Sequence, residues 1–382
     1  MGPKVISIKV GRRFDPAVGD GFVVGTTRPV WKGTGNAANN VGCIPGVSRA
    51  TVASVTQSPG ATFNDLNITG QVVITASNQT FHNCRFTYSY SGNSGGGMVD
   101  CQGTATGTVF DRCEFEPATP GDRYNGIYGS DFTARRTVIT KTVDGIGIYN
   151  PNDSVADVLV EGCWIGYLAW FNDDGYAASR ANSHSDGSHN DGTQHGSGVN
   201  VTYRGNFFQG AKYNATNPGN CVLDPDGVGY TLATGNGVDE LIAAPINTSN
   251  KTAGVAQIYL AQHSAYFHVG NISFTDNWCW NIGNAGFKVI SNRAASVSPE
   301  GSSGFSAITD VEFKRNIFGG TARDYGGTYK YYPGRFDTNI TVNGNSGRSV
   351  GAYADTDGNV WDAAAAVASP GTAIYLRYDA PA

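Results

Sequence analysis

A six-residue pattern recurs along this chain and constrains its fold more than any other feature. An apolar residue is followed by two polar or small residues, then by Cys or Asn, a variable residue and a second apolar residue. The clearest copies are 81–86 (FHNCRF), 110–115, 160–165, 203–208 and 313–318, and looser copies start at Phe63, Ala134, Phe274 and Thr356. The first five starts, at 63, 81, 110, 134 and 160, are 18 to 29 residues apart. Such a period with variable excess is typical of a solenoid interrupted by loops.

Short strands that direct alternate side chains into a shared core would produce this pattern. The Cys or Asn position follows the polar pair, where the chain has to bend. We expect amides at this position to hydrogen-bond from coil to coil or to cap bent backbone; they belong to Asn206, Asn277, Asn316 and Asn359. A β-sandwich also repeats apolar triplets, but nine copies in one frame favour a solenoid. The sequence therefore predicts an all-β chain folded as a right-handed parallel β-helix.

Composition agrees with an all-β chain and excludes some partners. Of 382 residues 52 are Gly and only 15% are charged, while β-branched and aromatic residues are abundant. The net charge is −5 and there is no basic run, so nucleic acid is not expected as a partner. An acidic surface would also attract polyanionic glycans poorly, unless its charge is locally reversed. No stretch reaches the 18 apolar residues of a membrane span.

Seven cysteines are present. Cys84, Cys113 and Cys163 share one position of the pattern, which predicts small buried side chains stacked along the coil. Strands of adjacent coils lie about 4.8 Å apart, a separation that a disulfide tolerates. The odd number of cysteines and the lack of a secretion signal favour free thiols.

The pattern divides the chain into three parts. Residues 1–50 do not follow it and are interpreted as an N-terminal cap or attachment segment. Residues 51–360 form the β-helix, with excursions at 88–98 and 167–195 and a long departure at 211–270. Residues 361–382 form a C-terminal cap, in which Asp362 begins a short helix. No signal peptide is visible at the N-terminus, which is expected of a virion protein released by lysis.

The densest group of polar residues lies at 182–196 and contains His-x-Asp-Gly twice. Its candidate catalytic residues are His184, Asp186, His189 and Asp191, with Gln194 and His195 as candidate substrate-binding residues. Paired carboxylates can hydrolyse a glycosidic bond, and an Asp–His pair can transfer protons near neutral pH. Asp-Gly pairs also form turns, and turn formation is the interpretation favoured here. A second acidic group, which the long loop would have to bring to the site, comprises Asp173, Asp174, Asp224 and Asp226.

Aromatic residues offer flat apolar faces with polar edges, which sugar rings require. A cluster among Gly and Lys is the candidate exposed surface for a glycan or partner: Tyr325, Tyr329, Tyr331 and Tyr332. Trp164 and Trp278 adjoin the coil pattern and are expected to pack. No cofactor and no metal site are predicted.

At fold level, residues 40–320 resemble the right-handed parallel β-helix proteins of the pectate-lyase-like superfamily. The coil at 72–86 carries this resemblance, together with His189-Asn190-Asp191-Gly192-Thr193-Gln194 ahead of the coil at 199–208. The second segment is similar to the His-x-Asp-Gly-x-Gln figure of actinobacteriophage minor tail proteins. Neither the calcium-binding acidic cluster of pectate lyases nor the paired Asp, Gly-His-Gly and Arg-Ile-Lys set of polygalacturonases is recognisable.

The resemblance implies a virion tail protein that meets the host envelope. Our first hypothesis is a phage tail protein that docks on other tail proteins through residues 1–50 and binds host envelope glycan with its loops. A second is a polysaccharide depolymerase, a hydrolase or lyase that uses the Asp and His residues above. A third is a purely structural tail component. Many spike β-helices are trimers, and a homotrimer is expected here only by that analogy.

Overall fold

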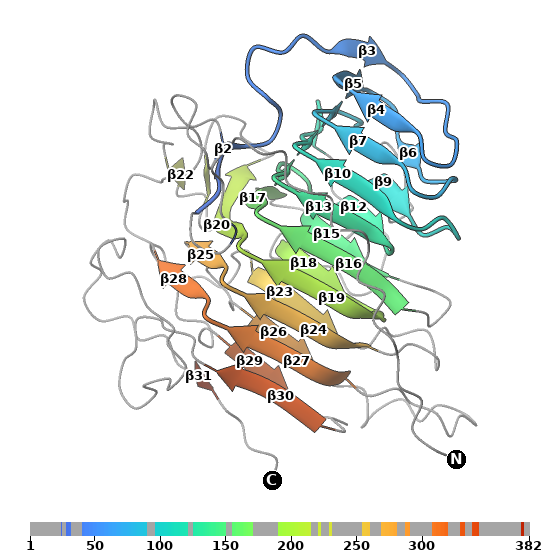
Figure 1. Ribbon diagram of the computed structural model, residues 1–382. Helices are drawn as coiled ribbons and strands as arrows, with labels where there is room; N and C mark the ends of the chain where they lie inside the picture. Colours follow the sequence, from blue (N-terminus) through green and yellow to red (C-terminus); the bar gives the residue numbers. More distant parts are fainter. Residues whose placement is uncertain are drawn as a thin grey trace, which may run out of the picture.

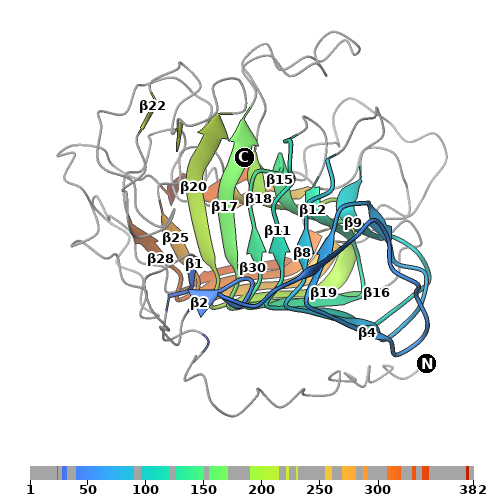
Figure 2. The same cartoon turned by 90° about the horizontal axis from the view of Figure 1, so that it is seen from above.

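The computed structural model describes residues 24, 28–31, 40–89, 96–120, 125–149, 155–170, 190–214, 221–222, 229–230, 254–259, 269–280, 287–290, 308–319, 329–332, 338–343 and 376–377. Within these residues there are strands and turns and no helix. The strands stack in three sheets that the chain visits in a fixed order (Figures 1 and 2). All their pairings are parallel except those of β20 with β21 and of β21 with β22. This arrangement fits the predicted parallel β-helix; its handedness stays a prediction. The predicted helix after Asp362 lies outside the described residues.

One pass through the three sheets is called a coil below. Sheet 1 has nine strands: β4 (Thr62–Asn64), β7 (Thr80–His82), β10 (Thr108–Asp111), β13 (Phe132–Arg135), β16 (Val155–Glu161), β19 (Gly198–Arg204), β24 (Val269–Thr275), β27 (Ile308–Lys314) and β30 (Thr338–Asn343). Sheet 2 has eleven: β3 (Ala50–Val52), β5 (Leu66–Ile68), β8 (Arg85–Phe86), β11 (Glu114–Phe115), β14 (Val138–Ile139), β17 (Trp164–Trp170), β20 (Phe207–Asn214), β21 (Cys221–Val222), β22 (Gly229–Tyr230), β25 (Trp278–Trp280) and β28 (Ile317–Gly319).

Sheet 3 has nine strands: β6 (Val72–Val73), β9 (Gly97–Cys101), β12 (Asn125–Gly129), β15 (Asp144–Ile148), β18 (Asp191–His195), β23 (Gly254–Tyr259), β26 (Phe287–Ile290), β29 (Tyr329–Tyr332) and β31 (Leu376–Arg377). A separate parallel pair joins β1 (Val30–Trp31) to β2 (Asn40–Val41). Parts of the predicted excursions at 167–195 and 211–270 are therefore strands of the coil, namely 167–170, 191–195, 211–214, 254–259 and 269–270.

The six-residue pattern is the bend from sheet 1 into sheet 2. Its apolar ends point into the coil and stack on their counterparts in neighbouring coils. In sheet 1 the ring of Phe81 lies 4.8 Å from that of Phe63 and 5.4 Å from that of Phe110. In sheet 2 the rings of Phe86 and Phe115 are nearly parallel at 4.5 Å. The continuous apolar core predicted from the pattern is thus confirmed.

The first residue of each bend adopts the left-handed conformation. Its φ lies between 49° and 61° in eight successive coils: Asp65, Asn83, Arg112, Arg136, Gly162, Gly205, Asp276 and Arg315. Residues with a side chain pay about 1–2 kcal/mol for this conformation relative to the right-handed one. The coil therefore needs an opposing source of stability at every bend, and the next residue supplies it.

The second residue of the bend hydrogen-bonds to both neighbouring coils. Asn206 Nδ2 donates to Asn277 Oδ1 at 3.0 Å, and Asn277 Nδ2 donates to Asn316 Oδ1 at 2.8 Å. The same oxygens accept from backbone amides, as when Asn206 N donates to Asn277 Oδ1 at 2.9 Å. This is the predicted ladder of amides, confirmed for three of the four asparagines; Asn359 lies outside the described residues.

Cysteines occupy the same position in earlier coils and donate to the same carbonyl of the preceding coil. Cys84 Sγ lies 3.4 Å from Phe63 O, and Cys113 Sγ lies 3.3 Å from Phe81 O. All six cysteines with described side chains are free, as expected: Cys43, Cys84, Cys101, Cys113, Cys163 and Cys279. Burial raises the pKa of the Cys163 thiol to about 12, which keeps it protonated as a donor.

Charges of opposite sign alternate along the outer edge of sheet 1. His82, Asp111, Arg135, Glu161 and Arg204 occupy one register row in consecutive coils. Polar contacts join members of this row, including a hydrogen bond between His82 Nδ1 and Asp111 at 3.0 Å and an ion pair of Arg204 with Glu161 at 2.6 Å. Opposite charges on adjacent strands stabilise a sheet and oppose register slips.

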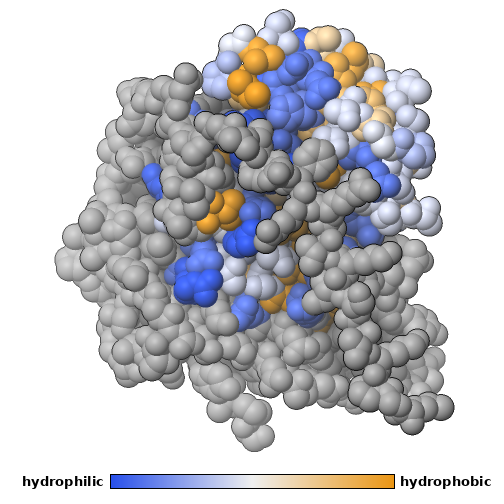
Figure 3. All heavy atoms as spheres, viewed as in Figure 1, coloured by the Kyte–Doolittle hydropathy of each residue, from blue (hydrophilic) through white to orange (hydrophobic). Residues whose placement is uncertain are grey.

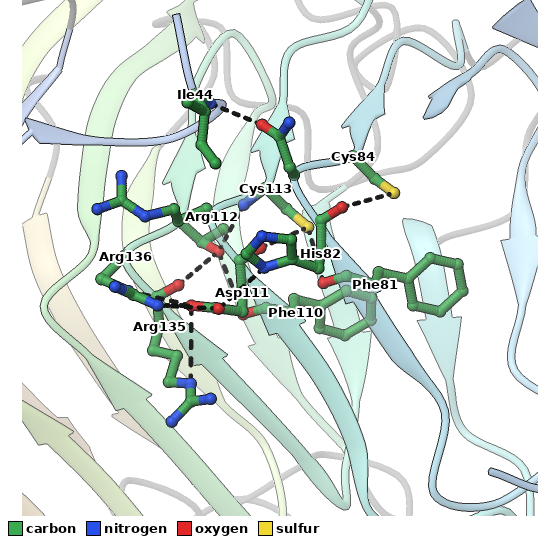
Figure 4. Close-up of polar contacts among 12 residues, drawn as sticks. Ile44, Phe81, His82, Cys84, Phe110, Asp111, Arg112, Cys113, Arg135 and Arg136 are labelled. Carbon is green, nitrogen blue, oxygen red and sulfur yellow. Dashed lines mark hydrogen bonds and ion pairs between the residues drawn. The ribbon is translucent and has the colours of Figure 1, made fainter. Parts of the chain in front are cut away.

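Asp111 is the centre of this row (Figure 4). The Nη2 of Arg136 lies 2.9 Å from both of its carboxylate oxygens, and Arg135 Nε lies 3.7 Å away. Burial alone would raise the pKa of Asp111, but the hydrogen bond to His82 and the two guanidinium groups outweigh it and hold that pKa below its usual value. The carboxylate is therefore ionised and serves as a tie between three coils.

The N-terminal segment runs along the outside of the coil, at the corner where the strands of sheet 2 begin (Figure 2). Arg28 lies 4.7 Å from the centre of the Phe207 ring, and Trp31 packs on Trp164 at 5.1 Å. Further along, Ile44 N donates to Asn83 Oδ1 at 2.6 Å. These contacts lie on the side of the coil, and the interpretation of residues 1–50 as a cap or attachment segment stays a prediction.

That end is formed by β3, β4 and β6, where apolar side chains are visible at the top of Figure 3. Val73 there is 48% exposed, and the side chains packed against the core from this end are only partly buried: Val52, Val55, Phe63 and Leu66. A cover for this end would have to come from outside the described residues or from another molecule.

Truncating the ladder should destabilise the coil strongly. Asn277→Ala removes bonds to Asn206, Asn316 and the Tyr203 carbonyl and leaves their buried partners unsatisfied. We expect a loss of about 3 kcal/mol in the free energy of unfolding, measured by denaturant titration. The matched control is Asn67→Ala, which removes an exposed bond to Thr51 and a long bond from Thr87 and should cost about 0.5 kcal/mol. Equal losses in the two variants would contradict a special role for the ladder.

Candidate functional site

The lengths of the connections between strands indicate that the candidate site lies on the outer face of sheet 3. The link from sheet 1 to sheet 2 is the same short bend in every described coil, whereas both ends of the sheet 3 strands join connections of variable length. Those entering sheet 3 range from 69–71 to 215–253, and those leaving it range from 196–197 to 291–307. Loops of variable length on a solenoid gather on the face that binds ligands.

One register row identifies the outer face of this sheet. Asp100, Tyr128, Gly147 and Gln194 are aligned in consecutive strands. Asp100, Tyr128 and Gln194 are half-buried, while the residue before each of them, Val99, Ile127 and Thr193, is fully buried. The row therefore lies on the outside of the coil.

Two tyrosines form an aromatic pair on this face. The rings of Tyr128 and Tyr149 are nearly parallel, 11° apart, with centres separated by 5.9 Å. Gly147 leaves the space for this arrangement, because a Cβ there would lie 2.5 Å from Tyr128 Cδ2 and 3.0 Å from Asn125 Nδ2. Half-buried tyrosines present an apolar ring together with a hydroxyl group, a combination suited to sugar rings.

Two carboxylates lie at the starts of neighbouring strands of sheet 3, Asp144 in β15 and Asp191 in β18. Asp191 N donates to Asp144 Oδ1 at 2.8 Å, and Gln194 Nε2 donates to Asp191 Oδ2 at 3.3 Å. The Asp144 carboxylate is thus held by the backbone of β18, and the Asp191 carboxylate by the side chain of Gln194 in the same strand. Carboxylates held in this way can accept hydrogen bonds from hydroxyl groups, and a pair of them can carry general acid–base chemistry.

Gly126 and Gly145 lie where neighbouring parts of the coil pack too closely for a Cβ. A Cβ on Gly145 would lie 2.3 Å from the Gly192 carbonyl oxygen, and one on Gly126 would lie 2.4 Å from Ile139 Cγ2. Asp191 and Gly192 both belong to β18, so the interpretation of this pair as a turn was wrong. A missed signal was the repeat of Asn or Asp, Gly and Ile or Thr at 125–127, 144–146 and 191–193.

The structure brings only part of the predicted site together. Asp191 and Gln194 lie on the outer face of sheet 3, with the Asp191 residue 9% exposed. Tyr128, Tyr149, Asp144 and Asn125 join them and were not predicted. The remaining candidates lie outside the described residues: His184, Asp186, His189, Tyr325, Asp173, Asp174, Asp224 and Asp226.

His195 was predicted to bind substrate, but its side chain lies inside the coil and is 0% exposed. Its ring contacts the edge-on rings of Tyr203 and Phe274 at 5.3 and 6.0 Å, and its Nε2 lies 3.4 Å from Thr193 Oγ1. Burial lowers the pKa of His195 to about 3, so the ring is neutral. Strand alternation explains the correction, because Gln194 faces outward and its neighbours face inward.

Three of the four tyrosines predicted to form an exposed surface belong to strand β29, namely Tyr329, Tyr331 and Tyr332. Tyr329 is in register with Phe287, and Tyr331 with Val289. These positions continue the rows of Thr193 and His195 through Ala256 and Ile258. Tyr329 and Tyr331 thus share register rows with buried residues, and we do not include them in the candidate site.

The Asp111 cluster is the other dense group of charges, and its geometry indicates a structural role. Its carboxylate is already surrounded by Arg136, Arg135 and His82. It lies at the constant bend, where no loop of variable length enters. Among the described residues no three His, Cys, Asp or Glu side chains are arranged to hold a metal ion, and no helix there is long and apolar enough to cross a membrane.

A scan against protein-family models, a search of curated proteins and a search of solved structures each found no match.

Acid should weaken the coil through His195. Its folded pKa of about 3 lies below the value of 6.5 for a free ring, so the unfolded chain binds the extra proton. This contribution to stability is complete above pH 6.5 and is lost as the pH falls toward 3. Between pH 7.5 and pH 5 we expect a loss of about 2 kcal/mol.

The comparison that isolates this effect is wild type against His195→Leu, unfolded by denaturant at both pH values. Asp131 acts in the opposite direction, because burial, with a smaller contribution from Asp157, raises its pKa to about 6 and favours folding at lower pH. Asp131 is present in both proteins, so the difference between them reports His195. A pH dependence unchanged in His195→Leu would contradict the assignment.

Proposed function

We propose that this protein binds a cell-envelope polysaccharide on the outer face of sheet 3, as a component of a bacteriophage tail. The observation that carries the binding function is the Tyr128–Tyr149 pair beside Asp144, Asp191 and Gln194. The tail assignment is supported by the resemblance of residues 189–194 and of the coil pattern to minor tail proteins. Docking on other tail proteins through residues 1–50 belongs to the same proposal.

The chemistry of the face suits a linear glycan. Sugar rings stack on aromatic faces, and their hydroxyl groups bond to carboxylate and amide side chains. Neighbouring strands are about 4.8 Å apart, close to the length of one hexose unit. A chain lying along the axis of the coil would thus place successive sugars over successive strands, from the tyrosine pair to Gln194.

A depolymerase is the second candidate, and the adjacent Asp144 and Asp191 favour it. The test is release of reducing ends and of unsaturated products from purified host-envelope polysaccharide. If the protein is an enzyme of this kind, Asp144→Asn and Asp191→Asn should each lower the rate at least about 100-fold, and so should the predicted Asp186→Asn if that residue takes part. Retained binding with no product from wild type would instead leave a binding protein.

The binding function is tested by truncating the aromatic pair. Tyr128→Ala removes a stacking face and should weaken binding to the polysaccharide roughly 10-fold, whereas Tyr128→Phe keeps the ring and should stay within about threefold of wild type. Binding is measured by affinity electrophoresis in gels containing the polysaccharide. Circular dichroism of both variants checks that the coil is intact. Unchanged binding by a folded Tyr128→Ala variant would exclude this face.

A further inference from the structure

The outer row of sheet 3 continues along the whole coil. Each of its members is in register with the next on the adjacent strand. In order, the row comprises Val73, Asp100, Tyr128, Gly147, Gln194, Gln257, Lys288, Lys330 and Arg377. Where side chains are described, Val73 is exposed and Asp100, Tyr128 and Gln194 are half-buried, so the row marks the outer face.

The chemistry of the row changes along the coil. Its early positions carry an acid and an aromatic residue, its middle positions carry two amides, and its last three positions carry cations. Lys288, Lys330 and Arg377 lie on consecutive strands β26, β29 and β31, with backbones about 4.8 Å apart. Like charges at facing positions of adjacent strands repel and destabilise a sheet.

This succession departs from the way the rest of the coil arranges charge. Along sheet 1 the row through Asp111 and Glu161 alternates in sign and forms ion pairs, and at the bends Arg315 pairs with Asp276 at 2.6 Å. The chain as a whole carries a net charge of −5. Three cations in one row therefore depart from the alternation of sign seen in sheet 1, and such departures are expected at functional sites.

We propose that Lys288, Lys330 and Arg377 form an anion-binding stretch that takes carboxylate or phosphate groups of an acidic polysaccharide. The proposal rests on the proposed function: the same glycan chain that stacks on Tyr128 and Tyr149 continues along the axis to the cations. Its repeat then combines neutral sugars with an acidic unit. The local charge reversal answers the objection that an acidic protein attracts polyanions poorly.

The test compares Lys330→Gln with Lys314→Gln, which removes one positive charge from sheet 1. The probes are polygalacturonate, poly(glycerol phosphate) and neutral dextran, immobilised for binding measurements at several salt concentrations. Lys330→Gln should weaken binding to an acidic polymer on the order of fivefold at low salt and reduce its salt dependence. Lys314→Gln should leave both unchanged, and the carboxylate and phosphate polymers distinguish the two sources of the anion.

Several outcomes would overturn the proposal. They are binding of wild type to dextran alone, equal effects of the two substitutions, or binding that does not change with salt. Tighter binding to duplex DNA than to either acidic polymer would assign the cations to nucleic acid instead. If Tyr128→Ala abolishes glycan binding while Lys330→Gln has no effect, the proposed function stands and only the anion-binding stretch is excluded.

Discussion

Seven of the eight described bends from sheet 1 into sheet 2 span two residues, and the peptide groups at these bends are buried. The first residue accepts a left-handed conformation, and the second must satisfy backbone groups of its own coil and of its neighbours. Asn does this with both ends of its amide, as between Asn206 and Asn277. Cys can only donate, as Cys113 does to Phe81 O. The stacking of the coils depends on this one interaction, since it fixes their spacing and register at the bend.

This bend is also why half of the fold could be predicted. A position that holds Cys, Thr or Asn in every described bend after the first, which has Leu66, leaves a regular trace in the sequence, and the apolar residues on either side mark the strands of sheets 1 and 2. Sheet 3 left a weaker trace, the repeat at 125–127, 144–146 and 191–193, which was missed. Its strands are rich in Gly, as in Asn125–Gly129 and Asp144–Ile148, because neighbouring backbones approach too closely for a Cβ. Asp191-Gly192 therefore resembles a turn in sequence while it forms a strand in the structure.

The candidate site was predicted in part for the same reason. Clustering of polar residues found Asp191 and Gln194, because they stand within a single polar segment. It did not find Tyr128, Tyr149 or Asp144, which come from other coils and meet the segment only through the register of sheet 3. His195 shows the opposite error: sequence proximity grouped it with Gln194, whereas strand alternation places the two on opposite sides of the sheet. Register between coils, which no single-segment motif records, decides membership of the site.

The course of the N-terminal segment has a consequence for how the protein is made. Trp31 rests on Trp164, and Arg28 on the ring of Phe207, so residues that leave the ribosome first have their partners among residues that leave it much later. The early coils can stack in order as they emerge, but this segment has to wait until the chain has grown past residue 207. Its docking is therefore a late step of folding, and the apolar outer surface of sheet 2 stays open to other contacts until then.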